Sequence, residues 1–405
     1  MRTVRFSTSF SFAFSICLLA TSALAASPQE TVLHNFGSST DGWLPLAPLT
    51  MDATGNIYGT TSSAGASGGT VFELTPNGDG TWTETILHQF GFGTDGTKPL
   101  AGVVVAADGK IYGTTSAGGT NNDGVIFKLT PESGGVWDEK ILLNFDGENG
   151  AVPSTLVSNS GYLYGATSSG GKFDYGIVFR MTHEPSGEWT EKILHTFNDN
   201  GKDGYNPPGG IVFDSAGDLY STTALGGAHG YGTVFELLPQ TPGAWPEKII
   251  HSFNDNGTDG YSPEPGLAFD SSGDLFGATN AGGSFNLGAV FRLTPDSTGP
   301  WSEKILHSFG NGMDGSVPFA GVIADSAGNL YGTTDGGGTG GRGAVFEMIH
   351  HTSGYWSESV LHSFGSGNDG YFPRAGVIVD KWGNIYGTTL VGGTDEQGTV
   401  FEVMP

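Results

Sequence analysis

The run Trp301-Ser302-Glu303-Lys304-Ile305-Leu306-His307-Ser308-Phe309 decides the fold, because polar and apolar side chains alternate along it. An alternation with period two indicates a β-strand whose two faces meet different surroundings. A fixed phrase follows, with Asp314-Gly315, then Pro318, then Gly328 to Thr334. The whole unit recurs along the chain, so the repeat determines what can be said about architecture.

The phenylalanine that closes this strand marks seven copies, spaced 52 to 56 residues apart. The copies end at Phe36, Phe90, Phe145, Phe197, Phe253, Phe309 and Phe364. Each is followed by an aromatic residue that opens a Tyr-Gly-Thr-Thr phrase or its variant: Tyr58, Tyr112, Tyr164, Tyr220, Phe276, Tyr331 and Tyr386. No linker separates the copies, so we expect them to form one domain.

Each copy contains four strand candidates, which in the sixth copy cover 320–324, 329–334, 344–348 and 356–364. A tight turn joins the first two, and a glycine-rich loop joins the second and third. Four short antiparallel strands per unit of about 50 residues are typical of a β-propeller blade. We therefore predict an all-β, seven-bladed β-propeller with four-stranded blades.

The two ends of the chain complement each other. The last copy stops after Val400–Val403 without a fourth strand, whereas residues 28–36 form a fourth strand without a blade. We expect this N-terminal strand to complete the last blade and close the ring, which removes open sheet edges. An open β-array is the alternative. The predicted blades span 37–90, 91–145, 146–197, 198–253, 254–309, 310–364 and 365–405 plus 28–36.

Residues 1–25 read as a secretory signal peptide, with Arg2 and Arg5 before an apolar stretch and small residues ahead of a cleavage point near Ala25. Cys17, the only cysteine, leaves with it, so the mature domain 26–405 has neither a disulfide nor a cysteine metal site. We expect a monomer that is secreted to the periplasm or the medium. No second apolar run is long enough to span a membrane.

The formal net charge of −25 makes nucleic acid and anionic membranes poor partners. Charged residues are only 14% of the chain, so this is not a disordered acidic segment. Glycine, at 69 residues, occupies fixed places in the repeat and indicates turns.

Histidine recurs at one register of the fourth strand in six copies, and glutamate stands four positions earlier in all seven. Such pairs suggest acid–base chemistry. However, equivalent pairs on outer strands of different blades cannot converge on one substrate, and Leu143 replaces the histidine in the third copy. We therefore interpret them as structural hydrogen-bonding groups. The tryptophan that opens six of these strands is expected to pack between blades, with a sugar-binding platform as the alternative.

The Asp-Gly phrase lies between each fourth strand and the next first strand, where its chemistry suits a turn. Copies four and five carry more oxygen ligands and resemble a calcium loop, although the closing glutamate of an EF-hand is missing. We therefore take calcium as the candidate ion, and otherwise expect no cofactor. Its candidate ligands are Asp199, Asp203, Asp255 and Asp259.

The glycine-pair loop that follows Tyr-Gly-Thr-Thr should emerge on the same face as the Asp-Gly loop. It lacks the Lys-Ser/Thr and the helix of a phosphate loop. We expect this face to bind ligands, and its most irregular residues are the candidates for specificity. They are Lys172, Asp174, Tyr175, His229, Tyr231 and Arg342. The sequence offers no residue that we assign as catalytic.

The phrases Tyr-Gly-Thr-Thr-x-x-Gly-Gly, Gly-Thr/Ala-Val-Phe-Glu-Leu-Thr-Pro, Leu-His-x-Phe and Asp-Gly-x-x-Pro recur in this order over 31–405. In these phrases the chain resembles the Gloeo-Verruco tandem repeat family, also called the choice-of-anchor tandem repeat family GloVer. The resemblance implies a secreted or surface-bound bacterial protein with a propeller-like fold, and it implies no activity. Many members carry an anchoring segment; this sequence shows none, which favours free secretion.

Two functions remain open from the sequence. The first is a non-catalytic binding or scaffold module for an extracellular carbohydrate or protein. The second is a hydrolase or lyase that acts on a sugar, lactone or polysaccharide at the mouth of the central channel. Catalysis needs one asymmetric set of groups, and the close repetition favours binding.

Overall fold

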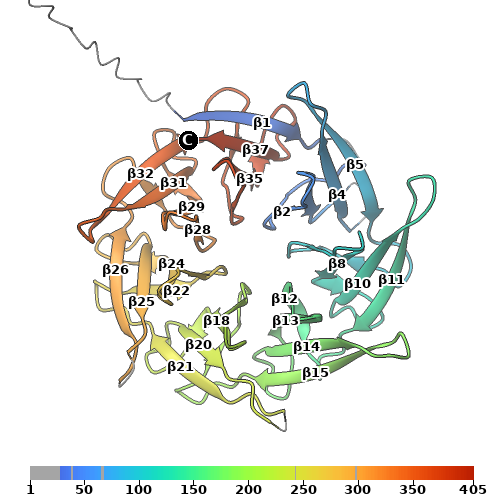
Figure 1. Ribbon diagram of the computed structural model, residues 1–405, viewed down its shortest axis with the longest axis horizontal. Helices are drawn as coiled ribbons and strands as arrows, with labels where there is room; N and C mark the ends of the chain where they lie inside the picture. The colour runs from blue at the N-terminus through green and yellow to red at the C-terminus, as the bar shows by residue number, and fades with distance from the viewer. Residues whose placement is uncertain (1–27, 38–39, 65–67, 242, 297–298) are drawn as a thin grey trace, which may run out of the picture.

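The computed structural model describes residues 28–405, apart from 38–39, 65–67, 242 and 297–298. The predicted signal peptide lies outside the described residues. The described part of the chain contains strands and no helix, and its sheets stand around a central axis (Figure 1). The predicted seven-bladed β-propeller is therefore confirmed. Over the same residues no helix is long and apolar enough to cross a membrane.

The seven blades are four-stranded antiparallel sheets, and the strands of each blade are named from the innermost to the outermost. Blade 1 comprises β2 (Thr50–Met51), β3 (Ile57–Thr61), β4 (Thr70–Pro76) and β5 (Trp82–Gln89). Blade 2 comprises β7 (Val104–Val105), β8 (Ile111–Thr115), β10 (Val125–Pro131) and β11 (Trp137–Asn144). Blade 3 comprises β12 (Ala151–Asn159), β13 (Tyr162–Ser169), β14 (Ile177–His183) and β15 (Trp189–Thr196).

Blade 4 comprises β17 (Val212–Phe213), β18 (Leu219–Thr223), β20 (Thr233–Leu237) and β21 (Glu247–Ser252). Blade 5 comprises β23 (Ala268–Phe269), β24 (Leu275–Gly282), β25 (Ala289–Thr294) and β26 (Ser302–Ser308), and β22 (Gly260–Pro263) also pairs with β24. Blade 6 comprises β28 (Ile323–Ala324), β29 (Leu330–Thr334), β31 (Ala344–His350) and β32 (Trp356–Ser363). Blade 7 comprises β34 (Ile378–Val379), β35 (Ile385–Thr389), β37 (Thr399–Met404) and β1 (Gln29–Asn35).

The ring closes through the N-terminal strand, as predicted. β1 pairs antiparallel with β37, from Gln29 opposite Met404 to Asn35 opposite Thr399. Figure 1 shows the blue N-terminal strand beside the red C-terminal one. Two further hydrogen bonds extend the seam, since the Phe36 N–H donates to the Gly398 carbonyl at 3.0 Å and the Thr394 N–H to Asn35 Oδ1 at 3.0 Å. The outer strand of blade 7 is therefore supplied by the opposite end of the sequence.

Short ladders bring the two kinds of loop together on one face. They pair β6 (Gly96–Thr97) with β9 (Ala117–Gly118), β16 (Gly204–Tyr205) with β19 (Leu225–Gly226), β27 (Gly315–Ser316) with β30 (Gly336–Gly337), and β33 (Gly370–Tyr371) with β36 (Val391–Gly392). In each ladder an Asp-Gly glycine lies opposite a glycine of the glycine-pair loop. The predicted juxtaposition of these loops is confirmed.

We call this surface the loop face. Its Asp-Gly loops comprise 40–49, 91–103, 146–151, 198–211, 254–267, 310–322 and 365–377. Its glycine-pair loops comprise 62–64 with 68–69, and 116–124, 168–176, 224–232, 280–288, 335–343 and 390–398. The tight turns within each blade lie at the other end of the strands, and we call that end the turn face.

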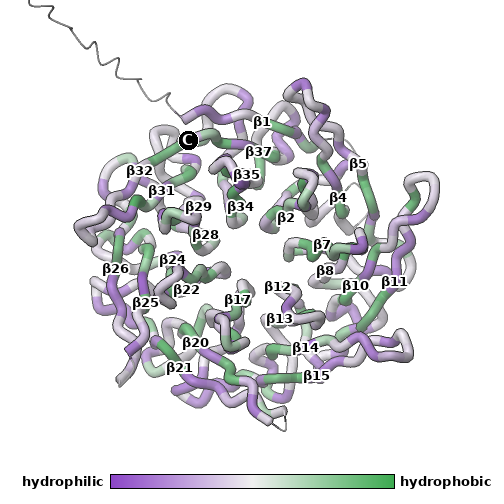
Figure 2. The backbone as a smooth tube through the Cα atoms, viewed as in Figure 1, coloured by the Kyte–Doolittle hydropathy of each residue, from purple (hydrophilic) through white to green (hydrophobic). Residues whose placement is uncertain are grey.

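The core lies between neighbouring blades. The phenylalanine that ends each outer strand is fully buried and meets a phenylalanine of the next blade, with ring centroids 4.9 to 5.6 Å apart. The pairs are Phe36–Phe72, Phe90–Phe127, Phe145–Phe179, Phe197–Phe235, Phe253–Phe291, Phe309–Phe346 and Phe364–Phe401. Figure 2 shows the matching pattern, with hydrophobic stretches on the strands of each blade and hydrophilic stretches on the outer turns.

The strand-opening tryptophans also pack between blades. Five of the six contact the aromatic residue of the Tyr-Gly-Thr-Thr phrase in the preceding blade, at 5.6 to 6.5 Å between ring centroids. The pairs are Trp82–Tyr386, Trp189–Tyr112, Trp245–Tyr164, Trp301–Tyr220 and Trp356–Phe276. In these five the interpretation as an inter-blade packing residue holds, because the ring is occupied by protein.

A feature that the sequence did not reveal is the backbone before each repeated proline. A residue before proline ordinarily prefers an extended conformation, yet all seven have φ between 53° and 62°. They are Leu44, Lys98, Val152, Asn206, Ser262, Val317 and Phe372. Hydrogen bonds hold this conformation: the Val317 N–H donates to Leu287 of the preceding blade, and its carbonyl accepts from Asp335 of its own. The strained residue thus joins two blades.

Replacement of Val152 by asparagine should stabilise the protein. A left-handed φ of 56° is costly for a β-branched residue, whereas asparagine tolerates it and occupies the equivalent position as Asn206. The Val152 side chain is 36% exposed, so little packing is lost. We expect Val152→Asn to raise the free energy of unfolding by about 0.5–1 kcal/mol, measured by urea denaturation. An equal loss would show that the conformation carries no strain.

Candidate functional site

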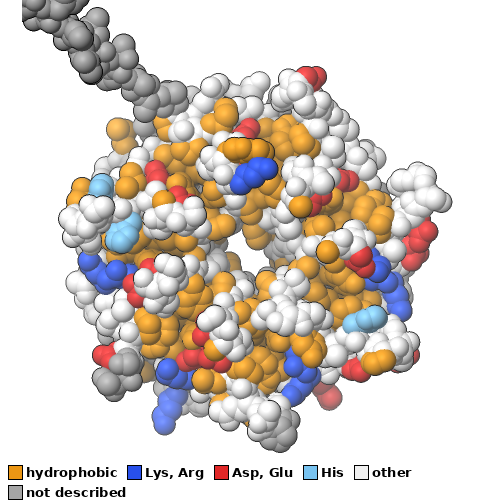
Figure 3. All heavy atoms as spheres, viewed as in Figure 1, with side chains coloured by type: hydrophobic (Ala, Val, Ile, Leu, Met, Phe, Trp, Pro, Cys, Tyr) orange, Lys and Arg blue, Asp and Glu red, His pale blue; other side chains and the backbone are white. Residues whose placement is uncertain are grey.

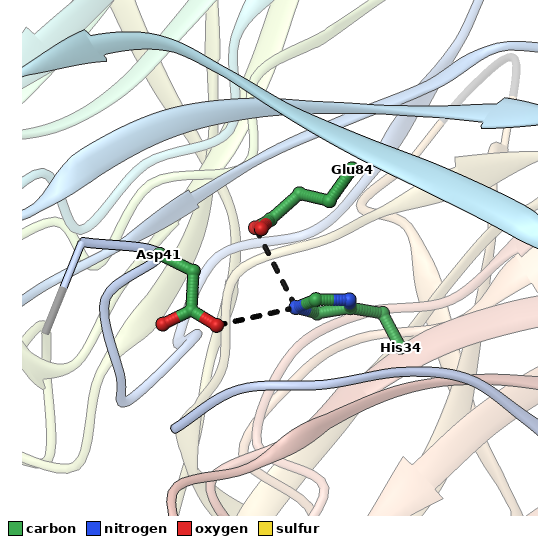
Figure 4. A group of neighbouring side chains, drawn as sticks. All are labelled: His34, Asp41 and Glu84. Carbon is green, nitrogen blue, oxygen red and sulfur yellow. Dashed lines mark ion pairs between the residues drawn. The ribbon is translucent and has the colours of Figure 1, made fainter. Parts of the chain in front are cut away.

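Titratable side chains gather at the boundaries between blades. The histidine and glutamate that share one outer strand do not pair with each other. Instead, His34 on β1 faces Asp41 of the following loop, with 3.7 Å between Nε2 and Oδ2, and Glu84 on β5 of the next blade, with 3.5 Å between Nε2 and Oε1 (Figure 4). Each boundary cluster, as we call this arrangement, therefore takes its members from two blades.

Four boundaries assemble all three residues, with their ligating atoms within 4.8 Å of one another. These boundary clusters are His34–Asp41–Glu84, His88–Asp95–Glu139, His195–Asp203–Glu247 and His251–Asp259–Glu303. At two further boundaries His307 bonds Asp314 at 3.0 Å and His362 bonds Asp369 at 3.1 Å. Hydrogen bonds also join His88 to Asp95 at 3.1 Å and His195 to Asp203 at 3.3 Å, which agrees with the structural interpretation of the histidines.

Burial keeps part of each cluster neutral. Desolvation, with repulsion from the neighbouring aspartate, raises the pKa of Glu84 to about 8 and that of Glu247 to about 9. Desolvation lowers the pKa of His34, against the opposing influence of Asp41. At neutral pH the cluster of His34, Asp41 and Glu84 therefore holds a neutral imidazole and a proton on Glu84.

The residues predicted as calcium ligands separate into two kinds. Asp203 and Asp259 are buried members of the boundary clusters, and their Oδ2 atoms accept the N–H groups of Asn198 and Asn254 at 3.0 Å. Asp199 and Asp255 are exposed and belong to no group of three or more potential ligands among the described residues. The side chains of Asn200 and Asn256 accept backbone N–H groups within these loops.

Three of the predicted loop residues contact an aromatic ring of the neighbouring blade. Tyr175 meets Tyr205 at 4.9 Å and Tyr231 meets Tyr261 at 5.3 Å between ring centroids. The Arg342 guanidinium lies 4.4 Å from the ring centre of Tyr371. Their partners follow Asp-Gly directly and were missed in the sequence, although that position is aromatic in four copies: Trp43, Tyr205, Tyr261 and Tyr371.

The other three predicted loop residues stand apart. Lys172 is exposed and lies 5.0 Å from the ring centre of Phe173. Asp174 has φ of 63° and accepts the Gly170 N–H at 3.0 Å, so it shapes its own turn. His229 is exposed at the tip of its loop. The structure brings none of these three into one group with Arg342, since they lie on different blades.

Exposed hydrophobic side chains concentrate on the loop face. Among the described residues, those on or beside it are Phe92, Leu100, Val152, Phe173, Leu225, Tyr231, Phe285, Leu287 and Met313. Those elsewhere are Val136, Ile193, Tyr355, Trp382 and Met404. Apolar groups exposed together mark contact surfaces, so the loop face is the better candidate for binding.

The central channel is apolar. A cavity of about 590 Å³ lies around the axis and is walled by aliphatic side chains such as Val103, Leu156, Leu267 and Val377. Figure 3 shows one face hollowed at its centre, with hydrophobic side chains around the opening. Among the described lining residues Arg374 is the one charged side chain. The channel wall therefore offers no carboxylate or histidine for acid–base catalysis.

The residue after each repeated proline varies between the blades, with leucine in blades 1 and 2 and a different residue in each of the others. These residues are Leu46, Leu100, Ser154, Pro208, Glu264, Phe319 and Arg374. Arg374 donates from Nε to Asp335 Oδ1 at 2.7 Å, and its guanidinium lies 4.8 Å from the ring centre of Phe319. Burial raises the pKa of Glu264 to about 8. The charged residues at this position thus belong to blades 5 and 7.

Glu264 should make the protein less stable in alkali. Its pKa in the folded state exceeds that of the unfolded chain, so its contribution is most favourable below about pH 4.5 and is lost as the pH rises through about 8. Glu264→Gln removes this dependence. Each pKa unit corresponds to about 1.4 kcal/mol and partial exposure reduces the sum, so we expect the variant to gain roughly 2–3 kcal/mol on wild type between pH 5 and pH 9. Urea denaturation at both pH values measures it, and parallel changes in the two proteins would contradict it.

A family model described as the Gloeobacter/Verrucomicrobia repeat matches residues 21–179 and 154–401. The chain belongs to this repeat family. The resemblance found in the sequence phrases is therefore confirmed, and the propeller is the architecture that this member of the family adopts. No curated protein matches the chain.

Solved structures share the fold at low sequence identity. An ancestral GH74 enzyme aligns over 90% of this chain with a TM-score of 0.61 and 11% identity, and this chain spans about half of it, 48%. A putative oxidoreductase (glucose dehydrogenase) from Thermus thermophilus aligns over 93% of this chain and 100% of its own, with a TM-score of 0.45 and 15% identity. At 11% identity the likeness to the ancestral GH74 enzyme shows a shared fold and transfers no residue.

Proposed function

We propose that this Gloeobacter/Verrucomicrobia repeat protein is an exported, non-catalytic binding module whose loop face takes an extracellular carbohydrate. The observation that carries the proposal is the pair of tyrosine pairs at successive blade boundaries, Tyr175 with Tyr205 and Tyr231 with Tyr261. Sugars present apolar C–H faces between their hydroxyl groups. An aromatic ring with a polar tip suits such a ligand, because it buries one side and hydrogen-bonds at the edge.

Polar groups stand beside these rings. The Tyr261 hydroxyl donates to Asn286 Oδ1 at 2.9 Å, and the Tyr371 hydroxyl donates to a Glu396 carboxylate. Each of these two rings is therefore held against the glycine-pair loop of its own blade. A ring that is already fixed in place lowers the entropic cost of binding. The GH74 glycoside hydrolase that shares the fold is consistent with a carbohydrate ligand.

Binding without catalysis is favoured by the composition of the channel and the spacing of the clusters. The described channel lining lacks an acid–base pair, and the boundary clusters recur around the ring instead of meeting at one centre. A hydrolase or lyase requires two or more groups at one reacting bond. The enzyme alternative would have to rely on Arg374 of blade 7 and Glu264 of blade 5.

A screen of soluble and insoluble polysaccharides, which records binding and product release together, tests the proposal. We expect binding to at least one neutral polysaccharide with no soluble product. Product release that is lost in Glu264→Gln would favour the enzyme. Absence of binding to every glycan, with folding verified by circular dichroism, would remove carbohydrate as the ligand class.

A further inference from the structure

The boundary cluster between blades 4 and 5 is built like the ligand set of a metal ion. His251 extends from β21, Asp259 lies in the following loop, and Glu303 comes from β26 of the next blade. His251 Nε2 lies 3.4 Å from Asp259 Oδ2 and 3.6 Å from Glu303 Oε1. Both separations exceed the usual hydrogen-bond length of about 2.7–3.2 Å. They match the edge of about 3.3–3.4 Å of a tetrahedron with metal–ligand bonds of about 2.0–2.1 Å.

The same cluster contains polar atoms that the described protein leaves unsatisfied. His251 Nε2, Asp259 Oδ1 and Glu303 Oε1 are shielded from solvent and have no hydrogen-bond partner. The Asp259 side chain is only 7% exposed. Buried polar atoms are normally paired. Each of the three residues thus has one buried polar atom without a partner, which points to a missing species that accepts electron pairs.

An entry path to the cluster is present. Asp259 and Glu303 line a cavity of about 570 Å³ that also contacts Asn256, Thr258 and Ser284. This space admits an ion and a water molecule, which would complete four-coordination. The equivalent cluster between blades 3 and 4 repeats the geometry, with His195 Nε2 3.3 Å from Asp203 and 3.7 Å from Glu247. Asp203 Oδ1 is again buried and unpaired.

The third boundary supplies a natural contrast. Leu143 and Asn149 replace the histidine and the aspartate there, while Glu191 remains. Both changes occur in the same copy. If the three residues bind one ion, loss of the histidine removes the need for the aspartate, so both are free to change together. A hydrogen-bonded pair of carboxyl groups would not depend on the histidine.

We propose that the boundary clusters bind divalent transition-metal ions of the zinc class, through one imidazole and two carboxylates from two blades. An imidazole ligand favours zinc over calcium or magnesium, which prefer oxygen ligands alone. Each ion would fasten one blade to the next. The four complete clusters set the expected capacity at four ions per chain. This proposal does not depend on the proposed carbohydrate function.

Titration of the chelator-stripped protein with Zn²⁺ alone tests the proposal, followed by Co²⁺ for its absorption spectrum. We expect up to four ions per chain, a tetrahedral cobalt spectrum and a melting temperature raised by roughly 5 °C or more at saturation. Ca²⁺ should produce no comparable rise. Binding of Ca²⁺ in preference to Zn²⁺, or unchanged melting with Zn²⁺ and with EDTA, would overturn the proposal in favour of a purely hydrogen-bonded cluster.

A matched pair of variants locates the ions. Glu303→Gln should lower the zinc stoichiometry by one, because it removes a charged ligand and keeps the side-chain shape. Glu191→Gln changes the same register at the boundary without histidine, and it should leave the stoichiometry unchanged. A loss of zinc in Glu191→Gln, or none in Glu303→Gln, would contradict the assignment. The wild-type cobalt spectrum stands as evidence if either variant fails to fold.

Discussion

Removal of residues 28–36 should unfold the protein or lower its stability by at least about 5 kcal/mol. β1 supplies the whole outer strand of blade 7 and pairs with β37 over its length. Its last contact, Phe36, is fully buried against Phe72 of blade 1. The loss of one buried phenylalanine alone costs about 3–5 kcal/mol, and a domain has only about 5–15 kcal/mol in total.

Thermal denaturation of a chain that begins at Gly37 measures this loss. A chain that begins at Pro28 is the matched control and should melt like the mature protein. Exposure of the β37 edge should also cause self-association, because an unpaired strand edge is free to pair with another chain. Equal melting temperatures for the two truncated chains would refute closure of the ring through β1.

Addition of one methyl group at Gly113 should also destabilise the protein. A Cβ atom at this position would stand 2.4 Å from Cζ of Phe127, a ring that is itself buried against Phe90. Gly113 therefore leaves the space that the Phe127 ring occupies, whereas blade 4 has Ser221 at the same register. We expect Gly113→Ala to lower the free energy of unfolding by about 2–3 kcal/mol, measured by urea denaturation.

A second substitution tests the cause. Phe127→Leu shortens the ring that the new methyl group would strike, so the double variant should lose less stability than the sum of the two single variants. A coupling of about 1 kcal/mol or more is expected for residues in direct contact. Additive losses would mean that Gly113 is required for its backbone conformation, because the clash with Phe127 would then play no part.

Most of the fold could be predicted because the same hydrophobic pattern recurs in seven copies along the chain. Alternation in Trp301–Phe309 identified the outer strand, and the mismatch between residues 28–36 and the end at 400–403 identified the closure. Repetition made each inference testable against six further copies. The core contacts followed from the same positions, since a residue present in every copy fits a surface present in every blade.

The site was harder to predict, because it depends on contacts between copies. His251 and Glu247 share a strand, yet His251 faces Glu303, 52 positions away in the next blade. The strained φ before each proline was also hidden, since the residues there, such as Val152 and Phe372, have no preference for it. Repetition drew attention to the registers that recur in every copy, whereas Glu264 and Arg374 stand at a register that varies between blades.

The two proposals assign glycan binding to the tyrosine pairs and metal binding to the boundary clusters. Tyrosine pairs on the loop face would contact the ligand, while the boundary clusters would join the blades that carry those rings. Metal binding would then fix the spacing between successive tyrosine pairs, because each pair bridges the boundary between two blades. The binding measurement is therefore best made with zinc-loaded and metal-stripped protein side by side.

The affinity of the loop face for its glycan tests the central claim most directly. Using the tightest polysaccharide from the screen, isothermal titration should compare wild type with Tyr231→Ala/Tyr261→Ala and with Trp382→Ala, an exposed aromatic on the turn face. We predict that the double variant binds about 10- to 30-fold more weakly, as expected for the loss of two stacking contacts of roughly 1 kcal/mol each, while Trp382→Ala binds like wild type. Unchanged affinity in the double variant, or a loss confined to Trp382→Ala, would contradict the account.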